Sequence, residues 1–262
     1  MEIKFENYKL KDNTINFTIN SKDINGIIGN SKEDVLNIVN EKSVKRGKVL
    51  VDGKELNKEE LLSLKKTISI ADSNHLITFY NSIYEIMYYE IKRRNLSIKN
   101  PNKKIVDSLK IVGLDISILI KNINEISTSE KQLLSIALSL LSNPNIIILK
   151  EPLICLDRKN EKRLMILLQK LKDSYDKTII ILSEDSNILY QYTNHLIIAK
   201  TNKILIEGNS KDILERVDFL KRNRIPIPDI VEFTYLAKKN KKVKIDYHKD
   251  IRDIIKDIYK HV

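Results

Sequence analysis

One junction in this sequence has the residue types of a phosphate-binding site. The apolar run Ile24–Ile28 ends at Gly29, and a helical pattern follows over Lys32–Val39. We therefore expect a strand, a tight turn and a helix. A helix N-terminus attracts anions through its free amides and its macrodipole. Here Glu33 lies in the first turn, and Asn30 has capping-box spacing to it. These residues favour a helix capped by its own side chains over a phosphate site.

The elements around this junction alternate between short apolar runs and helical patterns. Strands are expected at residues 2–5, 15–19, 24–28, 49–51, 67–70, 146–149, 178–182, 195–199 and 203–206. Helices are expected at 32–39, 158–172 and 186–192, with a helix-rich stretch over about 75–142. Continuous apolar strands that alternate with helices indicate a mainly parallel sheet covered on both faces. Beyond Gly208 we expect mixed helix, broken at Pro226 and Pro228.

Charge and apolar patterning limit the partners of this chain. The net charge of +11 could attract nucleic acid or anionic lipid. The lysines are spread along the chain with acidic residues among them, so no nucleic-acid partner is expected. The longest apolar runs are too short to cross a bilayer, and the N-terminus lacks an apolar signal-peptide region. The chain has a single cysteine, Cys155, which excludes an internal disulfide and favours a reducing compartment. We therefore expect a cytoplasmic protein that reaches the inner face of the membrane through partners.

The stretch from Ile126 to Asp157 carries a resemblance to a known family. It reads ISTSEKQLLSIALSLLSNPNIIILKEPLICLD. Without a gap, this resembles the ABC ATPase segments LSGGQ-KQR-x-A-I-A-R-A-L and L-I-L-D-E-P-T-x-G-L-D. Residues 24–37 stand where the Walker A loop belongs, residues 178–185 match the strand that ends in T-H-D, and residues 194–214 match the segment that follows. The chain is thus identified as resembling the nucleotide-binding subunits of ABC transporters.

The resemblance implies a fold and a division of the chain. The implied fold is α/β of the P-loop NTPase type. It has a mainly parallel sheet with helices on both faces, an N-terminal antiparallel β subdomain, and an inserted helical subdomain at about 75–142. The ABC ATPase-like domain covers residues 1–215. Residues 216–262 resemble the small C-terminal extension of energy-coupling factor transporter ATPases.

The Walker A loop is altered at most of its positions. In the family, G-x-x-x-x-G-K-[ST] wraps backbone amides around a phosphate. The matching residues here are Gly29, Asn30, Ser31, Lys32 and Glu33, and the loop is about three residues short. Lys32 stands at the lysine position, while Ser31 replaces the glycine before it. Glu33 replaces the hydroxyl residue that binds Mg²⁺, so the cofactor-binding loop is expected to be degenerate.

The Walker B segment carries a change of charge. Lys150 stands at the position of the aspartate that orders Mg²⁺, which disfavours a metal ion there. Glu151 matches the residue that polarises the attacking water, and we expect it to be idle without metal and phosphate. Glu33 and Lys150 exchange charges at two positions that face each other in the family. We therefore hypothesise a salt bridge between them, with a nitrogen–oxygen distance below about 6 Å.

Two further phosphate-facing motifs are changed. Glu184 stands at the position of the switch histidine, where its charge would repel phosphate. The signature motif, which acts in trans on the partner's nucleotide, has become Ile126–Glu130. Ser127 keeps the hydroxyl, and its spacing to Glu130 fits a capping box. Asp157 of the D-loop is retained, so the resemblance implies that dimerisation outlasts catalysis.

Three other positions bear on the nucleotide site. The alignment puts Ser73 or Asn74 at the Q-loop glutamine. Tyr8 is the nearest candidate for the aromatic that stacks on adenine, although a buried structural tyrosine is favoured. His195 is expected to be an ordinary packing or surface residue rather than a substitute for the switch histidine.

These changes favour a catalytically impaired subunit. We expect a homologue of ABC ATP-binding proteins that acts as a dimerisation and coupling partner in a transport complex of energy-coupling factor type, for vitamin or metal uptake. Its expected partners are a second ABC ATPase subunit and an integral membrane coupling subunit. A heterodimer is favoured because two dead sites could not drive transport. No cofactor or metal site is expected, and ATP and Mg²⁺ would bind only if the site still works.

Two alternatives remain open at this point. The chain could be an active ABC ATPase that hydrolyses ATP with an atypical site, since Lys32 and Glu151 are retained. It could also be a soluble interaction or nucleic-acid-binding protein on an ABC fold, as the basic charge would allow. Nothing in the sequence names a transported substrate.

Overall fold

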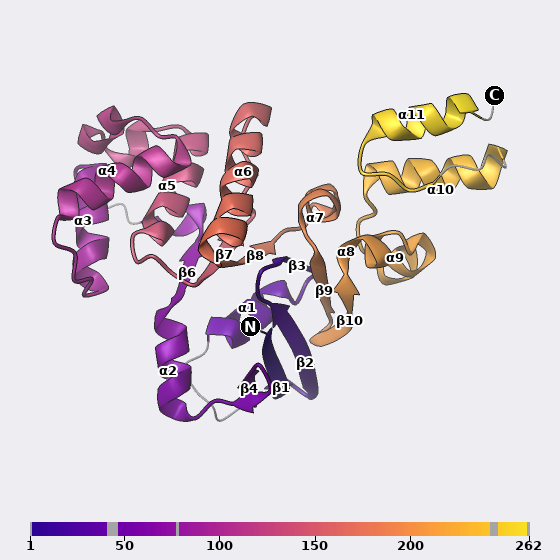
Figure 1. Ribbon diagram of the computed structural model, residues 1–262, viewed down its shortest axis with the longest axis horizontal. Helices are drawn as coiled ribbons and strands as arrows, with labels where there is room; N and C mark the ends of the chain where they lie inside the picture. Colours follow the sequence, from indigo (N-terminus) through magenta and orange to yellow (C-terminus); the bar gives the residue numbers. More distant parts are fainter. Residues whose placement is uncertain (1, 41–46, 77–78, 242–245, 261–262) are drawn as a thin grey trace.

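The computed structural model describes residues 2–40, 47–76, 79–241 and 246–260 (Figure 1). A six-stranded sheet in the order β10-β9-β3-β8-β7-β6 forms its core. Five of these strands run parallel, and β10 pairs with β9 in the antiparallel sense. The strands are β3 (Ile24–Ile28), β6 (Ile68–Ala71), β7 (Ile146–Lys150), β8 (Thr178–Leu182), β9 (His195–Lys200) and β10 (Lys203–Asn209).

Both faces of this sheet are buried, as its apolar strands predict. Successive side chains of a strand point to opposite faces. On β7, Ile147 and Leu149 belong to one core cluster, whereas Ile146 and Ile148 belong to the other. A strand covered on both faces needs apolar residues at every position, which explains its continuous apolar run.

A second, antiparallel sheet in the order β2-β1-β4-β5 packs on one of these faces. Its strands are β1 (Glu2–Leu10), β2 (Asn13–Asn20), β4 (Lys48–Val51) and β5 (Lys54–Glu55). Phe5 and Phe17 stack across the β1–β2 pair with ring centroids 4.6 Å apart. The same core cluster contains the helix α1 (Lys32–Asn40) through Val35, Leu36 and Val39.

The helical segment expected near residues 75–142 is present, apart from residues 77–78, which lie outside the described residues. In Figure 1 its helices gather beyond the β6 edge of the sheet. They pack into the larger core cluster through buried apolar residues. The elements are η2 (Ser73–His75), α3 (Ile83–Arg93), α4 (Pro101–Val112), η3 (Ile116–Ile120), η4 (Ile123–Glu125) and α5 (Thr128–Leu140).

The remaining helices connect the strands or follow the last one. A helix between β5 and β6, α2, was not expected from the sequence, although its capping box is readable there: Asn57 accepts from the Glu60 amide at 2.9 Å. The expected break at Pro226 and Pro228 falls between α9 and α10. These helices are α2 (Lys58–Lys66), α6 (Arg158–Tyr175), α7 (Ser186–Tyr192), α8 (Ser210–Leu214), α9 (Val217–Asn223), α10 (Asp229–Lys241) and α11 (Ile251–Lys260). Every helix in the described ranges is too short or too polar to cross a bilayer.

Candidate functional site

The turn between β3 and α1 uses its own amides. Only Gly29, Asn30 and Ser31 separate the strand from the helix. The Ser31 amide donates to the Ala199 carbonyl at 3.1 Å, and the Lys32 amide donates to the Gly29 carbonyl at 3.0 Å. Gly29 has φ +108°, and a Cβ there would lie 2.3 Å from the Ala199 oxygen. This glycine therefore allows the turn to approach β9, and two amides that could face an anion are already bonded.

The side chains of the turn are bonded to the β9–β10 hairpin. The Asn30 carboxamide accepts from the Thr201 amide at 3.0 Å, and the Ser31 hydroxyl accepts from the Asn202 amide at 2.9 Å. The expected Asn30–Glu33 capping box is wrong, because Asn30 bonds to the hairpin while Glu33 bonds to Lys150. Sequence spacing alone does not reveal a hairpin that is distant in the chain.

Lys32 is held by acidic residues rather than left free for a phosphate. Its ammonium forms an ion pair with Glu184 and lies 3.6 Å from a carboxylate oxygen of Glu151. Its side chain is only 15% exposed. Glu151 is itself fixed, because the Ser183 hydroxyl donates to it at 2.7 Å and the Glu184 amide at 2.9 Å. The structure thus brings the three sequence-predicted residues Lys32, Glu151 and Glu184 together.

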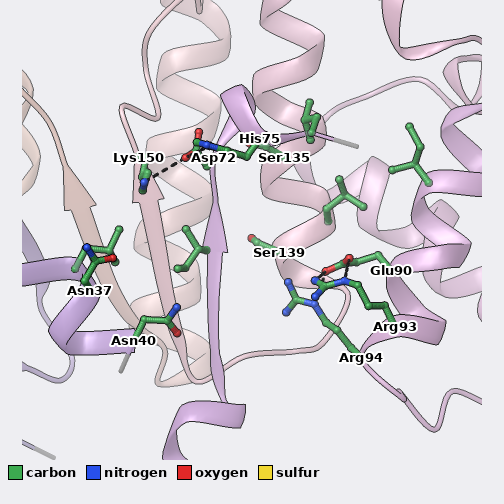
Figure 2. Close-up of a pocket in the computed structure, with 15 residues that line it drawn as sticks. Asn37, Asn40, Asp72, His75, Glu90, Arg93, Arg94, Ser135, Ser139 and Lys150 are labelled. Atoms are coloured by element: carbon green, nitrogen blue, oxygen red, sulfur yellow. Dashed lines mark hydrogen bonds and ion pairs between the residues drawn. The ribbon is translucent and has the colours of Figure 1, made fainter. Parts of the chain in front are cut away.

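Lys150 forms a second ion-pair cluster. Its ammonium lies 2.8 Å from Glu33. It also lies 3.3 Å from Asp72, and Figure 2 shows this second contact. The expected Glu33–Lys150 salt bridge is confirmed. His75 Nδ1 lies 2.8 Å from Asp72, whose carboxylate also accepts from the Asn74 amide at 3.0 Å. Sequence reasoning missed Asp72 and His75, although an aspartate just before a turn is a recognisable capping signal.

In this cluster, the partners of Lys150 and Asp72 affect the pKa values of the two groups more strongly than burial does. Burial opposes the charge of Lys150, but the hydrogen bonds and charges of Glu33 and Asp72 raise its pKa above the usual range. Burial likewise opposes the charge of Asp72. The hydrogen bonds from Asn74, His75 and Lys150 nevertheless hold its pKa below the usual range. Both groups are therefore kept ionised near neutral pH.

The two clusters occupy the ends of β3, β7 and β8, where an α/β sheet usually binds its ligands. A phosphate entering here would meet carboxylates already bonded to Lys32. A divalent cation would meet the ammonium of Lys150, which repels it. Within the ranges that the structure describes, no group of three or more metal-ligating side chains is arranged to hold an ion.

The N-terminus of α5 is capped by the side chains of Ser127 and Glu130. The Ser127 amide and hydroxyl donate to the Glu130 carboxylate at 2.7 and 2.8 Å, and the Glu130 amide donates to the Ser127 hydroxyl at 3.2 Å. The expected capping box is therefore confirmed. The Ser127 amide and then its hydroxyl lower the pKa of Glu130. The Glu130 carboxylate therefore compensates the partial positive charge at this helix N-terminus.

The remaining sequence-predicted residues have structural surroundings. Asp157 is the N-cap of α6 and accepts from the Asn160 amide at 2.7 Å. Tyr8 is fully buried, with its ring 5.8 Å from that of Phe5, so its structural interpretation is confirmed. His195 is buried on β9, and burial lowers its pKa, which confirms a packing role. The Q-loop candidates Ser73 and Asn74 form the start of η2.

A parallel sheet with an antiparallel sheet on one face and an inserted helical segment defines the fold class of ATP-binding cassettes. The family described as ABC transporter matches residues 13–154, just over half of the chain. The chain therefore belongs to the ABC transporter family.

Similar proteins agree with this assignment. The energy-coupling factor transporter ATP-binding protein EcfA2 of Acetivibrio thermocellus is 26% identical over 252 residues, covering 94% of this chain and 88% of that protein. The protein of the same name from Caldanaerobacter subterraneus is 22% identical, with 94% and 86% covered.

Solved structures confirm the fold. The cbiO1 protein of Clostridium perfringens, part of the ABC transporter complex cbiONQ, has a TM-score of 0.67 at 23% identity, covering 89% of this chain and 98% of that one. The dimeric ATP-binding cassette MJ0796, bound to ADP and Pi, has a TM-score of 0.65 at 21% identity, covering 80% and 99%. The expected α/β cassette fold is thus confirmed.

Proposed function

We propose that this chain is a catalytically impaired ABC subunit of a membrane transport complex of the energy-coupling factor type. In this proposal it serves as a dimerisation and coupling partner, and its own ion pairs take the place of MgATP. The observation that carries the proposal is the pair of charge clusters around Lys32 and Lys150.

The Lys32 cluster supports loss of phosphate binding. A lysine that neutralises phosphate must exchange its present partners for the ligand. Here it would have to leave Glu184 and Glu151, both of which would then repel the phosphate. The turn has few hydrogen-bond donors available for a phosphate, because the amides of Ser31 and Lys32 are bonded within the protein. Ligand binding would therefore cost several existing interactions.

The Lys150 cluster supports loss of Mg²⁺ binding. Mg²⁺ needs oxygen ligands in near-octahedral geometry. The carboxylates of Glu33 and Asp72 beside this position already bond to the Lys150 ammonium. The residues present do not fit a bound divalent cation, and a fixed ammonium neutralises these carboxylates in its place.

The proposed partners come from the relatives. Two of them are named ATP-binding proteins of energy-coupling factor transporters, and one similar cassette was solved as a dimer. We therefore propose a second, competent ATPase subunit and an integral membrane coupling subunit as partners, with the chain at the inner face of the membrane. We propose that residues 1–215 form the cassette domain and that residues 216–262 form a C-terminal extension.

Nucleotide binding tests the impaired site. A ligand present at a hundred times its Kd stabilises a protein by about 2.7 kcal/mol, which raises the melting temperature by roughly 5–10 °C at this size. We expect no shift for this chain with millimolar ATP and Mg²⁺, while a relative with an intact loop shifts under the same conditions. A clear shift for this chain contradicts the impaired site.

An active ABC ATPase is the second candidate, because Lys32 and Glu151 are both retained. Steady-state phosphate release from the purified chain separates the two. The active enzyme predicts turnover that Glu151→Gln abolishes, whereas the impaired subunit predicts equal background for both proteins. Purification from the native cell tests the partner proposal independently, since it reads out whether an ATPase and a membrane subunit accompany the chain.

A further inference from the structure

A groove lies between α4 and α6, and none of its described lining residues belongs to the Lys32 or Lys150 cluster. Its volume is about 350 Å³. Five of the residues that line it are apolar, and the other two are Arg163 and Lys170. Figure 1 shows α6 beside the helical segment to which α4 belongs. We call this feature the α4–α6 groove.

The apolar part of the groove is open to solvent. Ile111 of α4 is 50% exposed and Ile166 of α6 is 69% exposed. Ile166 comes three residues after Arg163 and four before Lys170, so these three side chains share one face of α6. Covering the two isoleucines would remove apolar surface from water, which favours association with a second apolar surface.

Arg163 is held at one end of the groove. A Cβ on Gly113, the C-cap of α4, would lie 2.8 Å from an Arg163 guanidinium nitrogen, so the guanidinium rests against the C-terminus of that helix. The partial negative charge of a helix C-terminus favours a cation there. In the part of the chain that the structure describes, neither Arg163 nor Lys170 forms an ion pair with a carboxylate. Both charges are therefore available to a partner.

The two helices that form the groove are basic. Together they carry nine cationic against three acidic side chains, a net charge of +6, which is more than half of the chain's +11. Lys177, just after α6, is only 8% exposed and has no acidic partner within the described ranges. Burial and the charge of Lys104 on α4 lower the pKa of Lys177. The described part of the chain thus leaves positive charge on both helices uncompensated.

We propose that the α4–α6 groove binds an acidic amphipathic helix of a partner protein. The apolar stripe of that helix covers Ile111 and Ile166, and two of its carboxylates lie near Arg163 and Lys170. These two cations are seven residues apart on α6, which corresponds to about 10 Å along the helix. Two carboxylates with the same spacing on a helix that lies along α6 match this distance.

The combination of charge and apolar surface distinguishes this occupant from others. Two copies of this chain that met through this face would bring like charges together, because a two-fold interface uses the same patch on both copies. A nucleic acid would compensate Arg163 and Lys170 but would leave Ile111 and Ile166 in water. A helix with acidic residues beside an apolar stripe is complementary to both parts of the groove.

Fluorescence anisotropy with the full-length chain at low salt tests the proposal. The probe is a fluorescein-labelled, alanine-rich peptide of about 18 residues, which is long enough to form a helix. It carries two glutamates about seven residues apart, with leucines between them on the same face. A control peptide of the same composition has its glutamates about five residues apart, which turns one of them away from that face. We expect the probe to bind about tenfold more tightly than the control.

Protein variants test the same contact from the other side. Lys170→Glu should weaken binding of the probe by about tenfold, because it places a carboxylate opposite a carboxylate. Lys162→Glu makes the same change of charge on the same helix but lies outside the groove lining, so it should change the Kd by less than about twofold. Ile166→Glu should also weaken binding by about tenfold, since it puts a charge in the apolar part of the groove.

The three substituted side chains are exposed, so the variants should fold, and their melting temperatures check this. The two peptides are compared on the unchanged chain and test the proposal independently of the variants. Absence of probe binding overturns the proposal, and so does equal binding of the two peptides. Equal weakening by Lys170→Glu and Lys162→Glu contradicts it and would indicate a general effect of charge. Competition by single-stranded DNA with the potency of the probe would also contradict it.

Discussion

Lys150 and Glu33 face each other with 2.8 Å between ammonium and carboxylate, which joins the end of β7 to the first turn of α1. Asp72 approaches the same ammonium at 3.3 Å and adds the segment after β6. One lysine thus joins three elements of the sheet core through ion pairs.

Lys150→Met should lower the free energy of unfolding by about 1–2 kcal/mol. The substitution keeps the aliphatic length but leaves the largely buried carboxylate of Asp72 without its cation. The estimate is modest because Glu33 is 53% exposed and partly solvated. Urea denaturation measures the change.

Lys48→Met is the matched control. Lys48 pairs with Glu55 at 2.7 Å, but both side chains are more than half exposed. An exposed pair contributes little to stability. We expect the unfolding midpoint to stay within error of the parent chain. A loss as large as that of Lys150→Met would show that the Lys150 cluster is no more than a surface ion pair.

Gly29→Ala should destabilise the protein severely, by about 3 kcal/mol or more. The new Cβ would lie 2.3 Å from the Ala199 carbonyl oxygen, on a backbone with φ +108°. Gly53→Ala provides the comparison, because φ is +81° there but nothing lies within 4 Å of the new Cβ. Its cost should be limited to about 1 kcal/mol of backbone strain. Similar melting temperatures for the two variants would contradict a packing role for Gly29.

Ser127→Ala should cost about 1 kcal/mol, since it removes the hydroxyl that caps α5. Ser127→Thr keeps that hydroxyl and should be close to neutral. Chemical denaturation of the two variants measures the difference. If alanine and threonine behave alike, the capping box does not stabilise this helix end.

The Asp72 carboxylate should make stability fall at acid pH. Its folded-state pKa is held below the ordinary value of 3.8, because the Asn74, His75 and Lys150 hydrogen bonds outweigh its burial. A lowered pKa contributes stability that is complete above the ordinary value and is lost as the pH falls through the folded value. Asp72→Asn should therefore be less stable than the parent chain at pH 6, and the gap should narrow below about pH 4. The melting temperatures of the two proteins across this pH range measure how their stability difference changes with pH. A difference that stays constant would exclude a contribution from protonation of Asp72.

Local patterns in the sequence predicted a large part of this structure. The apolar runs identified the parallel strands, because a strand buried on both faces leaves little choice of residue. The Ser127–Glu130 capping box was predicted because its partners are three residues apart on one helix end. The Glu33–Lys150 pair lies far apart in the chain. It was predicted only because the family resemblance placed the two positions face to face.

Tertiary structure decided which polar groups of the site are bonded to which. Asn30 had the spacing of a cap for α1, but the β9–β10 hairpin, 171 residues further on, supplies the amide that it accepts. Asp72 gained Lys150 as a partner because β6 and β7 lie side by side in the sheet. Short-range spacing determines helix caps, since their partners are neighbours in the chain, and continuous apolar runs identify the buried strands. The partners of a site at the ends of several strands are determined only when the sheet assembles and sets their distances.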